Sequence, residues 1–433
     1  MEGKNVYRKF MKKKPLTILL ILLIILILLL IVSAFISDLN RKNKQIINLT
    51  SDQKISDFDY LCEALDKGYP FWRDVNVSGI NKEIVYSEYR KNIEDTKTDI
   101  EFFKEIGYFL KEFGGYGHLT VLDGSMYRLY MDTLIIGNNL LNEQELQTIQ
   151  PLIQVLTNPI SQNTYSLLDQ SHTGFRSTAG LKDKYTNIEQ NQTLEENQTG
   201  ISTQILIEGK TAYLKLPSFE LTNIESDKII FENFFAEIKE LPNLIIDIRG
   251  NSGGSDLYWK QLLVSPNVKE DLKSERYFFF NMNEITQNYV NAIFMPNEII
   301  NTSDIGEVGH LSSYYEEFTN LVIESTLFKP SAQPYSGEIF VLVDEKVYSA
   351  SENFVMFCKN SGFATLVGTQ TNGDGGIADP LLISLPDSGL IVRFSMFYGV
   401  NPDGTGNEAT GTTPDVLINK DEDVLEKCLS LLN

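Results

Sequence analysis

The chain has 433 residues, of which 42% are hydrophobic and 22% are charged, which is typical of a globular protein with two or three domains. Its 37 Lys and Arg residues against 58 Asp and Glu residues give a net charge of −21, which argues against a nucleic-acid-binding protein. Residues 1–36 hold six of the basic residues and one acid, so residues 37–433 carry a charge of −26. That acidic body would be repelled by anionic lipid headgroups, so membrane attachment requires a separate segment.

Residues 16–36 form such a segment, because they are 21 uncharged and mostly apolar residues. At about 1.5 Å per residue, a helix of this length spans a hydrocarbon core of about 30 Å. The basic residues lie on its N-terminal side, so the positive-inside rule predicts that residues 1–15 are cytoplasmic and that the rest is extracellular. A cleaved signal peptide is the alternative, although Ser33-Ala34-Phe35 is a poor cleavage site. We expect an uncleaved signal anchor in the cell membrane with a single transmembrane helix.

The region after the anchor is predicted to be a polar stalk followed by helices. The stalk, residues 37–54, is polar and without pattern. Residues 55–117 place apolar side chains at helical spacing, and the last run stops at Gly114-Gly115, which predicts a helical N-terminal subdomain. Residues 118–200 form a connecting region that begins with further helical periodicity and ends in a polar stretch rich in Asn, Gln, Thr and Gly.

Strands and helices alternate in the second half of the chain, residues 201–433. Residues 243–250 are a continuous apolar strand that ends in a glycine-rich turn, after a predicted amphipathic helix. Residues 337–370 repeat the pattern with a buried-type strand at 337–345, a helix at 349–362 and a further strand at 363–370. This alternation predicts an α/β layer with a largely parallel sheet. An antiparallel hairpin follows, with residues 386–389 as its turn.

Two strand-to-helix junctions have unusual chemistry, at the sheet edge where open α/β folds place their sites. The first is the turn that contains Gly250, Gly253 and Gly254. Such a turn can direct backbone N–H groups at an anion or at a developing oxyanion, although it can also be a tight turn that only needs positive φ angles.

The second junction begins at Ser349. A serine at a helix N-terminus lies beside exposed N–H groups and the positive end of the helix dipole, which favour a nucleophile whose attack creates an oxyanion. Ser349 followed by Glu352 is also the pattern of an ordinary helix N-cap. This junction alone leaves both interpretations open.

Taken together, the segments DIRGNSGG, YSASENF and ATLVGTQTNGDGG resemble the carboxyl-terminal processing and tricorn-type serine peptidase family. TAYLKLPSF and NEATGTTPDVLI extend the resemblance over roughly residues 200–420. It implies that residues 201–433 are a catalytic core of the ClpP/crotonase-like α/β fold, with a mixed sheet and flanking helices. Many processing peptidases carry a PDZ module, but none is recognisable in residues 118–200.

The resemblance also implies roles for single residues. Ser349 would be the nucleophile, in an oxyanion hole built from the backbone N–H groups of Gly253, Gly254 and Ala350. The processing branch uses a lysine as the base, but Asp374 occupies its place here. The tricorn-like branch uses a histidine that follows a pattern matched by Gly117-His118, and a neutral imidazole can take the serine proton at neutral pH. Glu408 resembles the acid of that arrangement, with Glu352 and Asp415 as alternatives.

We therefore expect a membrane-anchored, extracytoplasmic serine peptidase that cleaves a peptide or protein substrate through an acyl-enzyme, with Ser349, His118 and Glu408 as a Ser-His-Glu triad. The three cysteines are widely spaced, so we expect no disulfide framework, and the three histidines are scattered, so we expect no metal site. We also expect no cofactor. The alternative is a catalytically inactive protein of the same fold that serves as a peptide-binding or envelope scaffold, because Asp374 replaces the lysine. The natural substrate and the oligomeric state stay open.

Overall fold

The computed structural model describes residues 47–140, 143–171, 200–304, 311–376, 380–401, 403–419 and 421–432. The expected membrane anchor at residues 16–36 lies outside these ranges. Within them, no helix combines the length and the apolar character needed to cross a bilayer. The described chain is a mixed α/β protein with a helical N-terminal region, as the sequence predicts.

The N-terminal region begins with helices, two of which start at a capping box. Thr50 and Gln53 form the first box, and Thr98 and Glu101 form the second, so each pair satisfies backbone N–H groups that the first helical turn leaves free. The helices are α3 (Ser51–Gly68), α4 (Trp72–Val77), α5 (Lys82–Glu94), α6 (Asp99–Lys111), α7 (Gly124–Leu140), α8 (Glu143–Thr148), α9 (Gln150–Leu156) and α10 (Pro159–Ser171). The first helix starts at Ser51, so residues 51–54 of the expected stalk are helical.

A six-stranded sheet forms the second half of the molecule, in the order β13-β9-β8-β4-β3-β2. All neighbouring strands are parallel except β2, which pairs antiparallel with β3. The largely parallel sheet that the alternating pattern predicts is therefore confirmed. Its strands are β2 (Ser202–Ile207), β3 (Thr211–Lys215), β4 (Asn243–Asp247), β8 (Glu338–Val343), β9 (Thr365–Gly368) and β13 (Val416–Leu417).

Helices cover both faces of this sheet, because its strands are apolar on both sides. Leu244 and Ile246 belong to the same buried cluster as side chains of α11 (Ile224–Ile238), α12 (Asp256–Trp259) and α14 (Ala350–Ser361). Ile245, between them on β4, belongs to the cluster on the other face, which includes α16 (Val424–Leu431). The alternation along β4 thus assigns successive side chains to opposite layers.

Two antiparallel sheets accompany the parallel sheet, in the orders β12-β5-β7-β6 and β1-β11-β10. Their strands are β1 (Thr120–Val121), β5 (Leu272–Phe280), β6 (Ile299–Asn301), β7 (Asn320–Phe328), β10 (Leu381–Ser384), β11 (Ile391–Phe394) and β12 (Tyr398–Val400). The predicted hairpin is confirmed as β10–β11. The remaining helical elements are α13 (Gln287–Ile293), α15 (Asn407–Thr410), a π-helix at Lys260–Val264 and 3-10 turns at Tyr116–His118 (η1), Leu221–Asn223, Ser265–Asn267, Thr302–Asp304 and Ser312–Tyr314.

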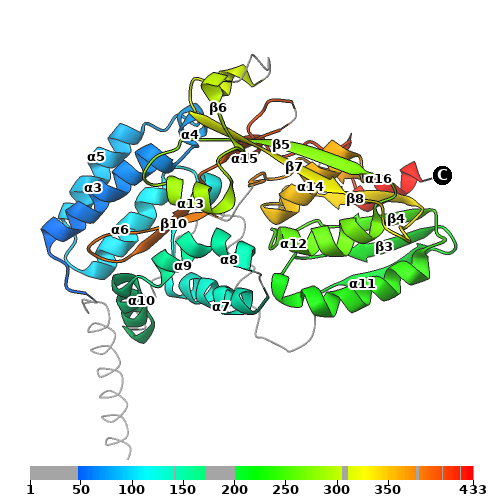
Figure 1. Ribbon diagram of the computed structural model, residues 1–433, viewed down its shortest axis with the longest axis horizontal. Coiled ribbons are helices and arrows are strands. Elements are labelled where there is room, and N and C mark those ends of the chain that lie inside the picture. The colour runs from blue at the N-terminus through cyan, green and yellow to red at the C-terminus, as the bar shows by residue number, and fades with distance from the viewer. Residues whose placement is uncertain are drawn as a thin grey trace, which may run out of the picture.

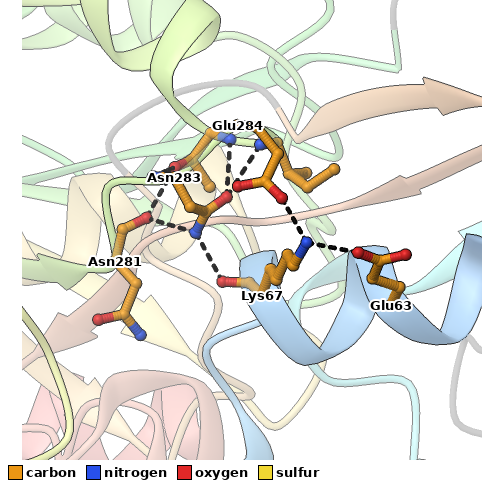
Figure 2. Close-up of polar contacts among 7 residues, drawn as sticks. Glu63, Lys67, Asn281, Asn283 and Glu284 are labelled. Atoms are coloured by element: carbon orange, nitrogen blue, oxygen red, sulfur yellow. Dashed lines mark hydrogen bonds and ion pairs between the residues drawn. The ribbon is translucent and has the colours of Figure 1, made fainter.

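Polar contacts from α3 fix the helical region to later parts of the chain. The buried carboxylate of Asp57 accepts hydrogen bonds from the backbone N–H groups of Asp387 (2.7 Å) and Ser388 (2.8 Å), in the turn of the β10–β11 hairpin. Figure 2 shows a second connection, in which the Lys67 ammonium lies between Glu63 of the same helix and Glu284, which follows β5. The Asn283 side chain also donates to the carbonyl of residue 67 (2.8 Å).

The core is divided between the two halves of the molecule. One buried cluster joins the N-terminal helices to both antiparallel sheets, and another joins the parallel sheet to α11, α12 and α14. In Figure 1, helices α3 to α6 (blue to cyan) lie on one side, β3, β4 and α11 (green) lie on the other, and α15 lies between them. Most of the site residues that the sequence predicts belong to segments at this junction: η1, α15 and the N-terminus of α14.

Candidate active site

Ser349 occupies a strained turn between β8 and α14. Its backbone angles are φ 57° and ψ −127°, which a residue with a side chain rarely adopts. It is the residue that precedes the first turn of α14, yet its side chain makes no capping hydrogen bond. The N-cap interpretation is therefore wrong for Ser349, and Glu352 does not complete a capping box because its carboxylate binds Asn407 and Thr412 instead.

Backbone strain is concentrated in the same part of the molecule. In the described ranges, four residues other than glycine have a positive φ angle: Asn48, His118, Ser349 and Asp374. Three of these belong to the predicted site or to the turn that differs from the family pattern. Such strain costs roughly 1–3 kcal/mol at each position and persists where the surrounding structure holds it, which is common in active sites.

The glycine turn after β4 packs against the Ser349 turn, as the two-junction interpretation requires. A Cβ atom placed on Gly253 would lie 3.0 Å from Ser349 Cβ and 3.1 Å from the backbone nitrogen of Ala350. The N–H group of Gly253 donates to Asn251 Oδ1 (2.9 Å), which also accepts from the hydroxyl of Ser351 (2.6 Å). Of the predicted oxyanion donors, Gly253 is thus already engaged.

The next residue, Gly254, forms a parallel bridge with Phe219. Phe219 donates to the carbonyl of Gly253 (2.9 Å), and the N–H group of Ser255 donates to the carbonyl of Phe219 (2.8 Å). In a parallel bridge of this kind, the middle residue directs its own N–H group away from the partner strand. The N–H groups of Gly254 and Ala350 therefore remain the better placed donors.

His118 lies in η1, with its ring between a carboxyl group and a guanidinium group. Its Nε2 atom pairs with Oδ2 of Asp374, and its Nδ1 atom lies 3.3 Å from Nη2 of Arg393 on β11. The ring also meets that of Tyr348 edge to face, with 5.3 Å between the ring centroids. Tyr348 directly precedes Ser349, so His118 lies in the neighbourhood of the serine. In the ranges that the structure describes, however, the Ser349 hydroxyl has no hydrogen bond to His118.

Glu408 lies on α15 and contacts the backbone beside His118 instead of its ring. Its Oε1 atom accepts a hydrogen bond from the N–H group of Gly117 (2.9 Å). Burial raises the pKa of Glu408 well above its ordinary value, and the charge of Asp374 raises it further. Gly117 is needed at this contact because a Cβ atom there would lie 2.2 Å from the ring of Phe71.

Asp374 is the residue that the sequence-based interpretation missed. It lies in the turn after β9, only 4% of its side-chain surface is exposed, and burial raises its pKa to about 7, although Glu408 and Arg393 act in the opposite direction. The sequence identified Asp374 only as the replacement of a lysine. An acid between glycines after a buried strand was a usable signal, whereas nothing in the sequence pointed to Arg393 or Tyr348.

Comparison with known proteins now identifies the family. Residues 210–418 match the profile of peptidase family S41. This region belongs to that family. The match covers both strand-to-helix junctions, the Asp374 turn and Glu408, and it confirms the resemblance to the carboxyl-terminal processing peptidases. It supports a serine peptidase that acts on a peptide or protein substrate.

Solved structures share the fold of this chain over most of its length. A candidate peptidase from Parabacteroides merdae ATCC 43184 has a TM-score of 0.52 at 20% identity, over 87% of this chain and 96% of that one. Mature CPAF complexed with lactacystin has a TM-score of 0.51 at 14% identity, over 85% of this chain and 94% of that one. At these identities the likeness concerns the fold alone. No curated protein matches the chain in sequence.

Within the S41 region, the two competing acids lie in other contacts. Glu352 is buried and accepts hydrogen bonds from Asn407 (2.8 Å) and Thr412 (2.5 Å). Asp415 forms an ion pair with Lys359 (2.5 Å) at the surface. Neither has a described contact with His118. The other two histidines, at positions 172 and 310, lie outside the described residues.

A cavity of about 820 Å³ is lined by β5, the second half of α14 and residues on both sides of Glu408 in the sequence. None of the six predicted site residues lines it. Ser349, the glycine turn, His118, Asp374 and Glu408 therefore form a group that is separate from the lining of this cavity.

Proposed function

We propose that this protein is a membrane-anchored, extracytoplasmic serine peptidase that hydrolyses peptide bonds through an acyl-enzyme on Ser349. The observation that carries the proposal is the strained backbone of Ser349 at the N-terminus of α14, with a side chain that caps nothing. A serine held in this way has its hydroxyl free for attack, beside the N–H groups that the helix start leaves unpaired. The ClpP/crotonase-like core, residues 201–433, is part of the same proposal.

In the reaction, Ser349 Oγ attacks the carbonyl carbon of the substrate while its proton passes to His118. The negative charge that develops on the carbonyl oxygen is stabilised by the N–H groups of Ala350 and Gly254, and Gly253 allows the turn to approach the serine closely. Collapse of the tetrahedral intermediate breaks the C–N bond, and the amine leaves with the proton from His118. Water then hydrolyses the acyl-enzyme by the same steps, and Glu408 is the acid end of the arrangement.

Catalysis requires a rearrangement from the arrangement described here. Nε2 of His118 faces Asp374, and Nδ1 lies beside Arg393, so both ring nitrogens already have partners. A base needs a free lone pair within hydrogen-bonding distance of the serine, and such distances often close only when substrate binds. We infer that substrate binding separates Arg393 from Nδ1.

The two partners of the His118 ring also favour a second candidate function. A catalytically inactive scaffold of this fold would keep His118 permanently between Asp374 and Arg393, and Ser349 would never be deprotonated. The membrane position is common to both functions, since it depends only on the apolar segment at residues 16–36 and the basic residues before it.

Fluorophosphonate labelling of the full-length protein in detergent separates the two functions. We expect the unmodified protein to be labelled and the Ser349→Ala and His118→Ala variants to lose the label. Ser361→Ala is the matched control, because Ser361 lies at the other end of α14, where its hydroxyl donates to the carbonyl of Phe357 (2.7 Å) and accepts from the N–H group of Phe363 (3.3 Å). A folded parent that stays unlabelled with substrate-like peptides present would favour the scaffold.

A further inference from the structure

The contacts of His118 determine where its proton lies. A guanidinium group can only donate hydrogen bonds, so Nδ1 must accept from Arg393 Nη2 and carries no proton. The proton of the neutral ring is therefore on Nε2, where it is donated to Oδ2 of Asp374. This carboxylate, and not that of Glu408, contacts the imidazole directly.

The contacts of Glu408 with Asp374 and with the backbone of Gly117 indicate its protonation state. As a carboxylate, Glu408 would leave its Oε2 atom buried without a hydrogen-bond partner. As a carboxylic acid, it can donate a hydrogen bond to Asp374, and a side-chain hydrogen bond between the two acids lowers the pKa of Asp374. Its Oε1 atom still accepts from Gly117. The protonated form of Glu408 thus provides a hydrogen-bonding role for the otherwise unpartnered carboxyl oxygen.

We propose that Asp374 is the positioning residue that orients His118, and that Glu408 acts one step behind it as a neutral acid that holds both Asp374 and the backbone of Gly117. The chain of contacts then runs from His118 to Asp374 to Glu408. This proposal deepens the proposed function and rests on it. It also assigns the task of the serine base to Nδ1, the reverse of the chymotrypsin-type triad, in which the acid holds Nδ1.

Backbone geometry supports the role of Asp374 independently of its charge. The residue has a φ angle of 62°, close to that of His118 (58°) and Ser349 (57°). Its turn is packed tightly, because a Cβ atom on Gly373 would lie 2.4 Å from the carbonyl oxygen of Asn407. The carbonyl of Gly373 also accepts from the N–H group of Ser349 (3.3 Å), so one turn connects the serine, the acid and α15.

The groups around Asp374 decide its charge. They come from several elements: His118 from η1, Tyr348 from the turn before α14, Glu352 from α14, Arg393 from β11, Glu408 from α15 and Tyr69 from the end of α3. Arg393 is the permanent cation of this set, and it favours the ionised form of Asp374. The hydroxyl of Tyr348 acts in the same direction through a hydrogen bond.

Nitrogen NMR of the full-length protein with ¹⁵N-labelled histidine tests the proposal. The chain has three histidines, so spectra of His172→Gln and His310→Gln leave the signals of His118 assigned. We expect the proton of neutral His118 on Nε2 in the unmodified protein. A proton on Nδ1 would overturn the proposal, and this measurement needs no variant of the site to fold.

The variants then show which acid acts on the ring. Asp374→Asn removes a charge next to the imidazolium, so the pH at which His118 titrates falls by about 1 unit or more, whereas Glu408→Gln moves it by less than about 0.5 units. Asp415→Asn is the control, since Asp415 pairs with Lys359. The proposal is refuted if Glu408→Gln causes the larger shift.

Labelling rates separate this proposal from the proposed function. Asp374→Asn lowers the fluorophosphonate labelling rate by about 10²–10⁴-fold, as loss of the orienting acid does in serine triads, and Glu408→Gln lowers it by about 10-fold or less. If the parent is never labelled while the NMR result holds, the peptidase proposal fails and the His118–Asp374 pair remains. If the parent is labelled and Asp374→Asn is labelled equally fast, Asp374 has no positioning role.

Discussion

The close approach of the glycine turn to Ser349 yields a sharp test of the site. Gly253→Ala places a Cβ atom 2.9 Å from the carbonyl oxygen of Tyr348, 3.0 Å from Ser349 Cβ and 3.1 Å from the nitrogen of Ala350. Gly250→Ala is the matched control in the same turn. Gly250 also has a positive φ angle (83°, against 115° for Gly253), but no atom lies within 4 Å of its added Cβ.

The two substitutions share one cost and differ in another. Each forces alanine into a positive φ, which costs roughly 1–2 kcal/mol and lowers the melting temperature by about 2–8 °C. Gly253→Ala adds about 1–3 kcal/mol for overpacking, since the Ser349 turn must move by a few tenths of an ångström. That movement displaces the N–H group of Ala350, and loss of one oxyanion donor costs about 10²–10³-fold in rate.

The assay measures fluorophosphonate labelling rates and thermal unfolding of both variants. We expect Gly253→Ala to lose about 10²–10³-fold in labelling rate and Gly250→Ala to stay within about twofold of the parent. Gly253→Ala that folds and is labelled at the parental rate would refute the argument that this turn forms one wall of the oxyanion hole. Equal loss in both variants would show that strain alone is responsible.

Two further predictions concern stability. Because the pKa of Glu408 is raised well above 4.5 in the fold, the native state keeps a proton that the unfolded chain releases, so stability falls as pH rises above about 4.5. Glu408→Gln removes this dependence. The free energy of unfolding of the variant relative to the parent, measured with denaturant, should therefore increase by up to about 1.4 kcal/mol per pH unit between pH 5 and 8. A difference that stays constant with pH would contradict the raised pKa. Asp57→Ala removes the carboxylate that accepts from the N–H groups of Asp387 and Ser388. We expect the free energy of unfolding to fall by about 2–4 kcal/mol in the same assay. A decrease below about 0.5 kcal/mol would show that this contact does not hold the hairpin.

Local sequence determined the parallel layer and its two junctions. Continuous apolar runs such as residues 243–247 can only be buried on both faces, and the amphipathic helices between them have the length that parallel connections require. The glycines after β4 and the serine before α14 follow from the same alternation, because sites in such folds lie where strands give way to helices. The family could therefore be inferred before the fold was known.

The antiparallel sheets could not be inferred in the same way. β1 has only two residues and pairs with β11, which lies far along the chain, and β5 and β7 were not distinguishable as partners. Short strands of this kind are specified by their neighbours on both faces and not by their own pattern. The position of η1, and hence of His118, depends on these pairings.

The sequence by itself determined which residue types could carry the chemistry: a serine at a helix start, a glycine turn and a histidine after glycine. Only the tertiary structure decided which acid contacts the histidine, because Asp374 and Glu408 are both remote from it in sequence and come together by packing. It also decided their charge, since burial removes the water that would keep both carboxyls ionised, and two buried acids in contact favour sharing a proton.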